Sequence, residues 1–139
     1  LMFIRDWTTS AQQGAGSSAG LLANHKAAME VMGAWEPGIV KDLTPDKKPM
    51  SDLGFFTFPS TGGQGDSKAM MGGADAFSVG ANAPDEAVEF LNFLMSKENQ
   101  EAYVKAFSAL PANKEAQDVV TEGALKEALD AYNDATSYS

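Results

Sequence analysis

The sequence has 139 residues, of which 44% are hydrophobic and 21% charged, and its formal net charge is −9 with no cysteine. These values predict one folded domain with a core, and the acidity excludes nucleic acid, which needs a basic surface. The lack of cysteine excludes disulfides and thiolate metal sites, and no apolar run is long enough to span a membrane.

The first part of the sequence predicts short elements separated by turns. Residues 1–13 are predicted to be the end of a helix, and residues 19–24 a second short helix. Residues 27–32 are short and apolar, which favours a buried strand. A helix at 35–43 follows, with Pro37 in the first turn, where proline is tolerated.

Two further strands are predicted in the middle of the sequence. Residues 53–58 contain three phenylalanines and end at Pro59, and residues 74–79 alternate larger and small side chains. The segments 44–50 and 60–67 are rich in residues typical of loops.

The last third of the sequence predicts helices. Pro84 occupies the first position of the clearest one, and the acidic residues after it suit a helix N-terminus. Further helices are expected at 97–107, with Ser96 as its cap, and at 114–120 and 124–133. Strands followed by helices indicate an α/β fold, in which a short central sheet is packed with helices. The apolar stripe of the clearest helix consists of Ala87, Phe90, Leu91, Leu94 and Met95.

Two predicted turns carry residues suited to a sugar, at positions where open α/β sheets bind ligands. Trp35 lies in a Gly-x-Trp turn, and an indole can stack on the apolar face of a pyranose. Gly72 and Gly73 allow close approach of backbone to ligand, and the Asp75 carboxylate can accept two hydroxyl hydrogen bonds.

Each of these residues also has a purely structural interpretation. Trp35 could pack in a core, Asp75 could cap a turn, and the glycine pair could form an ordinary turn. Met71 could line the same edge of the site or fill the core. Glu36 could bond a hydroxyl or simply favour a helix N-terminus.

Several short motifs follow one another in a distinctive order. They are the run that ends in the Gly-x-Trp turn (25–35), Phe-Thr-Phe-Pro (56–59), the Gly-Gly segment (72–79), the helix motif Ala-x-x-Phe-Leu-x-Phe-Leu (87–94), Glu-Asn-Gln (98–100) and Leu-Pro-Ala-Asn-Lys (110–114). In combination they resemble the C-terminal lobe of the extracellular solute-binding proteins of ABC transporters, the sugar-binding family 1 type in particular.

The resemblance implies that residues 1–139 are a fragment, a single partial domain of a protein with two lobes. The N-terminal lobe and the extreme C-terminus of such a protein are absent from this sequence. The implied fold is a periplasmic-binding-protein-like lobe of type II with a helical C-terminal third. The implied ligand is a mono- or oligosaccharide, bound as the two lobes close by Trp35, Asp75, Gly72, Gly73, Met71 and Glu36.

The implied partners are the missing N-terminal lobe and the permease subunits of an ABC importer. The implied location is the extracellular face of the membrane, through a lipid anchor, or the periplasm. The family implies a binder without catalysis, cofactor or metal. Two alternatives remain: a module associated with glycoside hydrolysis, and a non-catalytic protein-interaction module built on the acidic helices of 87–133. Glu30, Glu36 and Asp75 are available for acid–base chemistry, but their spacing does not pair them.

Overall fold

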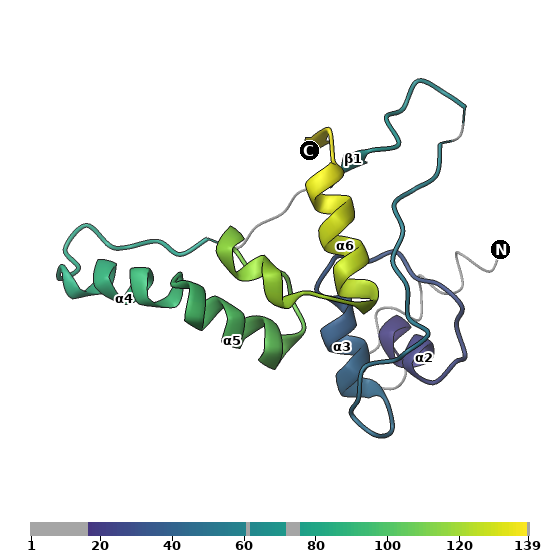
Figure 1. The fold of residues 1–139 in the computed structure, drawn as a ribbon, viewed down its shortest axis with the longest axis horizontal. Helices are drawn as coiled ribbons and strands as arrows, with labels where there is room; N and C mark the ends of the chain where they lie inside the picture. The colour runs from purple at the N-terminus through teal and green to yellow at the C-terminus, as the bar shows by residue number, and fades with distance from the viewer. Residues whose placement is uncertain (1–16, 61, 72–75, 139) are drawn as a thin grey trace.

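The computed structural model describes residues 17–60, 62–71 and 76–138, and it is rich in helix with little sheet (Figure 1). The predicted helix at 1–13 lies outside these residues. The elements in chain order are α2 (Ser18–Ala23), α3 (Glu36–Leu43), β1 (Ala69–Met70), α4 (Glu86–Leu94), α5 (Lys97–Phe107), the 3-10 helix η2 (Lys114–Val119), α6 (Gly123–Asp134) and β2 (Ser137–Tyr138).

The helix predictions within the described residues are confirmed, with small shifts at the ends. α4 begins at Glu86, two residues after the predicted proline, and η2 is a 3-10 helix where an ordinary helix was expected. The cap at Ser96 is confirmed because its hydroxyl accepts a hydrogen bond from the Asn99 N–H at 3.4 Å. Ser17 caps α2 in the same way, accepting from the Gly20 N–H at 3.0 Å.

The strand predictions differ from the structure. The segments 27–32 and 53–58 and the described part of 74–79 form no strand, and the sheet within the described residues consists of β1 and β2 alone, paired in parallel. The buried strand expected at 27–32 is wrong, because Met29 is 69% exposed. A strand is held by ladder hydrogen bonds to its neighbours, and the described residues supply no neighbour for these segments.

Most of the buried apolar side chains lie in two separate clusters. The first lies between α2 and α3, and the second joins α5, η2 and α6. The first cluster consists of Ala19, Leu22, Ala23 and Val40, with Leu43, Met50 and Leu53 packed against it; the second consists of Val104, Val120 and Leu129, with Leu110, Val119 and Leu125 against it.

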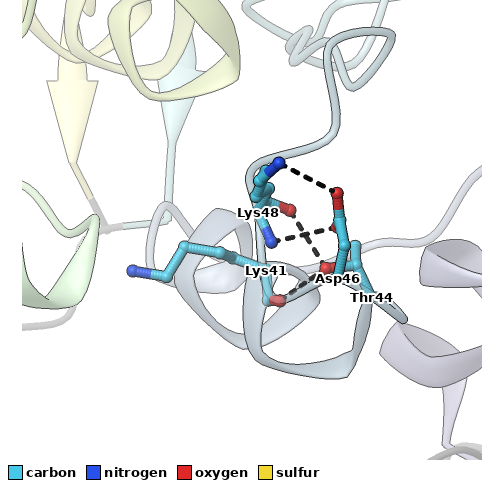
Figure 2. A network of polar contacts seen from close by, with 4 residues as sticks. All are labelled: Lys41, Thr44, Asp46 and Lys48. Atoms are coloured by element: carbon cyan, nitrogen blue, oxygen red, sulfur yellow. Dashed lines mark hydrogen bonds and ion pairs between the residues drawn. The ribbon is translucent and has the colours of Figure 1, made fainter.

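A polar network closes the loop that follows α3 (Figure 2). The buried Thr44 hydroxyl lies 2.8 Å from the Lys41 carbonyl oxygen and 3.0 Å from that of Lys48. The Lys48 N–H donates to the Asp46 carboxylate at 3.2 Å. These bonds satisfy backbone groups at the end of the helix and fix the predicted loop at 44–50 to α3.

Side-chain amides hold α4 and the chain after α5 together. The buried Gln100 donates to the Leu94 carbonyl at 3.0 Å and accepts from the Ala112 N–H at 2.8 Å. Asn113 donates to the Met95 carbonyl at 2.9 Å. The end of α4 is therefore fixed by hydrogen bonds rather than by apolar burial.

The apolar stripe predicted on α4 is only partly covered, because Ala87, Leu91 and Leu94 are half-buried and Phe90 and Met95 are exposed. No residue of α4 is buried, and Val88, Phe90 and Phe93 are all more than half exposed. In Figure 1, α4 lies at the left of the view, away from α2, α3 and α6.

A backbone contact joins the two clusters at Gly38. A Cβ atom at this position would lie 2.2 Å from the Phe107 carbonyl oxygen, at the end of α5. Next to it, the Lys41 ammonium donates to the Ala106 carbonyl at 3.4 Å. A glycine at position 38 is therefore required for α3 to approach α5 this closely.

We expect Gly38→Ala to destabilise the protein by about 1–3 kcal/mol, the usual cost of overpacking. Alanine favours a helix over glycine by about 1 kcal/mol, but the clash is with backbone, which cannot rotate away. Thermal unfolding followed by circular dichroism measures the effect. Gly65→Ala is the matched control, because open space surrounds that glycine. An equal midpoint for the two variants would contradict the contact.

Candidate functional site

The Gly-x-Trp turn forms the N-terminus of α3. The Glu36 N–H donates to the Gly33 carbonyl at 3.1 Å, and the Gly38 N–H to the Trp35 carbonyl at 3.2 Å. A Cβ atom at Gly33 would lie 2.3 Å from the indole Cζ3. The indole therefore lies against the Gly33 backbone, and only a residue without a side chain fits beneath it.

Trp35 does not occupy a core in this structure, since it is 55% exposed. An aromatic ring with one part resting on backbone and the rest open to solvent can serve as a stacking platform. Among the described residues, Trp35 is therefore not a core residue. Its contact with a ligand stays a prediction.

Glu36 lies directly after the tryptophan, and its carboxyl group is buried. The residue is 7% exposed, and it stands one turn before the fully buried Val40 on the same face of α3. Both carboxyl oxygens of Glu36 are buried without a hydrogen-bond donor, and so are both of Glu30. The expected contact of the Glu36 carboxyl with a ligand hydroxyl is therefore not available in this structure.

The two carboxyl groups lie within hydrogen-bonding reach of each other. Burial, together with the contact with Glu30, raises the pKa of Glu36 to about 8. Desolvation and a like charge both disfavour the carboxylate, and they outweigh the helix N-terminus, which favours it by only about 0.3–1 kcal/mol. Glu36 therefore carries a proton at neutral pH, and its protonated carboxyl can donate one hydrogen bond to an oxygen of Glu30.

Sequence reasoning missed this pair. Glu36 lies six positions after Glu30, a spacing that places the two residues on different faces of a helix and far apart along one face of a strand. The turn at Gly33 brings them together, so the glycine between two acids was the available signal.

The other predicted site residues give little further geometry. Gly72, Gly73 and Asp75 lie outside the described residues. Met71 directly follows β1 and is 90% exposed, so it does not fill a core.

Away from this turn, a hollow of about 490 Å³ lies between α6 and the segment that carries Phe56. An ion pair at 2.8 Å between Lys68 and Asp134 lies at its wall, and Asp134 raises the pKa of Lys68. Nearby, bonds from the Thr136 hydroxyl and the Lys68 N–H lower the pKa of Asp66. The sequence did not indicate this hollow, which is lined by Phe56, Thr57, Lys68, Asp130, Ala131 and Asp134.

Residues 4–131 match the family of bacterial extracellular solute-binding proteins. The match spans nearly the whole chain, and the chain belongs to this family. Its class is therefore that of extracellular proteins that bind a solute for import, and its family fold is periplasmic-binding-protein-like. No curated protein sequence matches the chain.

Two absences hold for the described part of the chain. No helix there is long and apolar enough to cross a membrane. No group of three or more histidine, aspartate or glutamate side chains is placed there to hold a metal ion.

We expect the free energy of unfolding to fall as the pH rises from 4.5 to about 8. The folded protein binds a proton at Glu36 that the unfolded chain releases above pH 4.5. The stability that this proton contributes is therefore fully present below pH 4.5, and it is lost as the pH rises through the pKa of Glu36 in the folded protein, about 8. The slope is at most about 1.4 kcal/mol per pH unit. Urea unfolding at pH 5, 7 and 9 measures it.

Glu36→Gln is expected to remove this pH dependence, while Glu89→Gln on the exposed α4 retains it. The shifts of Asp66 and Lys68 do not interfere. The lowered pKa of Asp66 affects stability at and below pH 3.8, and the raised pKa of Lys68 affects it at and above pH 10.5. Parallel curves for wild type and Glu36→Gln would contradict the assignment.

Proposed function

We propose that this chain is the C-terminal lobe of a carbohydrate-binding protein that delivers its ligand to an ABC importer. Membership in the solute-binding family supports the general class. The observation that carries the sugar assignment is the exposed indole of Trp35, held against the Gly33 backbone at the start of α3. In the intact protein, two lobes close around a mono- or oligosaccharide by hinge motion.

Trp35 acts in this proposal as the platform for one sugar ring. The C–H face of a pyranose buries apolar area on the indole, and its hydroxyls remain free for polar neighbours. The Asp75 carboxylate and the backbone at Gly72 and Gly73 bind those hydroxyls, and Met71 lines the edge. Glu36 supports the turn from beneath rather than touching the sugar, because its carboxyl oxygens are buried.

The exposed apolar segments are consistent with a lobe that lacks part of its sheet. Phe56, Phe58 and Phe77 are each about two-thirds exposed or more, an unusual arrangement for large aromatic side chains. In the proposed type II lobe, these segments become strands of the short central sheet. The missing N-terminal lobe forms the other half of the cleft.

The remaining parts of the proposal concern location and partners. The protein acts in the periplasm or on the extracellular face of the membrane through a lipid anchor, and the closed form is recognised by the permease subunits. It binds without turnover and uses no cofactor or metal.

We expect Trp35→Ala to weaken sugar binding by about 1–3 kcal/mol, through the loss of stacking area. The measurement is isothermal titration of the intact two-lobed protein with malto-, xylo-, arabino- and galacto-oligosaccharides, using the sugar that binds best. Unchanged affinity in Trp35→Ala would refute the platform.

Gly33→Ala tests the same platform from below. The new methyl group displaces the indole, because its carbon would stand 2.3 Å from the ring. We expect a loss of affinity in the same direction as for Trp35→Ala, with the tryptophan still present. Gly80→Ala is the matched control, since nothing lies within 4 Å of a Cβ atom there. A wild-type affinity for Gly33→Ala would show that the position of the indole is unimportant.

A protein-interaction module is the second candidate, and the exposed apolar side chains of Val88, Phe90 and Phe93 on α4 favour it. Adding sugars separates the two functions. A sugar-dependent tryptophan signal without product supports the binder, whereas the interaction module gives no response to any sugar.

A further inference from the structure

We propose that Glu30 and Glu36 form a positioning pair for Trp35, in which one shared proton holds the turn closed and its loss moves the indole. The proposal rests on the proposed function, because Trp35 is the platform of the proposed sugar site. It adds a regulation of that site by pH.

The pair bridges the two ends of the Gly-x-Trp turn. Glu30 precedes the turn, Glu36 begins α3, and Trp35 lies between them in the chain. The carboxyl contact and the hydrogen bond from the Glu36 N–H to the Gly33 carbonyl close the same short loop. Any change in the distance between the carboxyl groups therefore acts on the segment that carries the indole.

Residues 17–60, 62–71 and 76–138 offer the pair no alternative partner. All four carboxyl oxygens are buried without a donor from the described residues. A buried carboxylate in this setting is costly, and two adjacent carboxylates repel each other. One proton removes the repulsion and leaves a single buried charge, which accepts a hydrogen bond from the protonated carboxyl.

The charged groups on the elements packed against α3 do not replace that proton. α2 contains no titratable side chain. On α3, the Lys41 ammonium is directed to the Ala106 carbonyl at the end of α5. Lys105 lies in the last turn of α5, and the charge that acts on the Glu36 carboxyl is that of Glu30. Deprotonation thus leaves two like charges facing each other, one from each end of the Gly-x-Trp turn.

The consequence is a mechanical coupling between proton release and the indole. Repulsion pushes the Glu30 and Glu36 carboxyl groups apart and draws water towards them. Because α3 is fixed further along by the backbone contact at Gly38, the displacement is confined to the turn. Trp35 then leaves its place on the Gly33 backbone.

The test is a fluorescence titration of Trp35 without ligand, in a Trp7→Phe background, because the sequence contains two tryptophans. We expect one transition in the emission maximum, with its midpoint above pH 7, in line with a pKa near 8 for Glu36. Glu36→Gln is expected to abolish the transition and keep the low-pH spectrum at pH 9. Glu30→Gln is expected to move the midpoint to lower pH, because the like charge is gone and the amide can donate.

Controls separate positioning from other causes. Glu89→Gln and His25→Gln, the latter replacing the sole histidine, are expected to leave the midpoint unchanged. A transition that survives in Glu36→Gln, or no transition between pH 5 and 9, would overturn the proposal. So would a simultaneous loss of far-ultraviolet circular dichroism, which would show that the pair holds the fold as a whole. Because no sugar is added, a negative result would refute only the pH switch. The sugar-binding role of Trp35 is tested separately by the calorimetric titration of Trp35→Ala.

Discussion

The close approach of α3 to the end of α5 connects the two halves of the described structure. One apolar cluster lies between α2 and α3, the other among α5, η2 and α6. Gly38 allows the helix backbone to rest on the Phe107 carbonyl, and the neighbouring lysine adds a hydrogen bond. The same constraint anchors α3 as a fixed base, and the Gly-x-Trp turn is built on its first residues.

The helices could be predicted from the sequence because their signals are local. Ser96 caps α5 through its own neighbours, and the stripe on α4 follows from spacing alone. The strands could not be predicted in this way, because a strand needs hydrogen bonds to a neighbouring strand that can lie far away in the sequence. The segment 53–58 illustrates this: its Phe55 N–H donates to the Glu127 side chain on α6 at 2.6 Å, rather than to a neighbouring strand.

The candidate site was predictable only in part. Trp35 was predicted from residue type, a turn signal and the family resemblance, and its exposure is consistent with the proposed role. The burial of Glu36 could not be predicted from the sequence, because it depends on how α3 packs against the rest of the structure. The partner of Glu36 was equally hidden, because a turn and not a periodic element brings Glu30 to it. Contacts made by a turn depend on tertiary structure, and helix or strand periodicity in the sequence does not predict them.

The uncovered face of α4 has a consequence for the behaviour of the protein in solution. Its aromatic side chains favour association between molecules, whereas the net charge of −9 keeps molecules apart. Salt screens charges beyond about 10 Å at 0.1 M but leaves apolar attraction intact. We therefore expect the colloidal stability of the protein to be electrostatic in origin, with concentrated samples dispersed at low ionic strength and associating through α4 as salt is added.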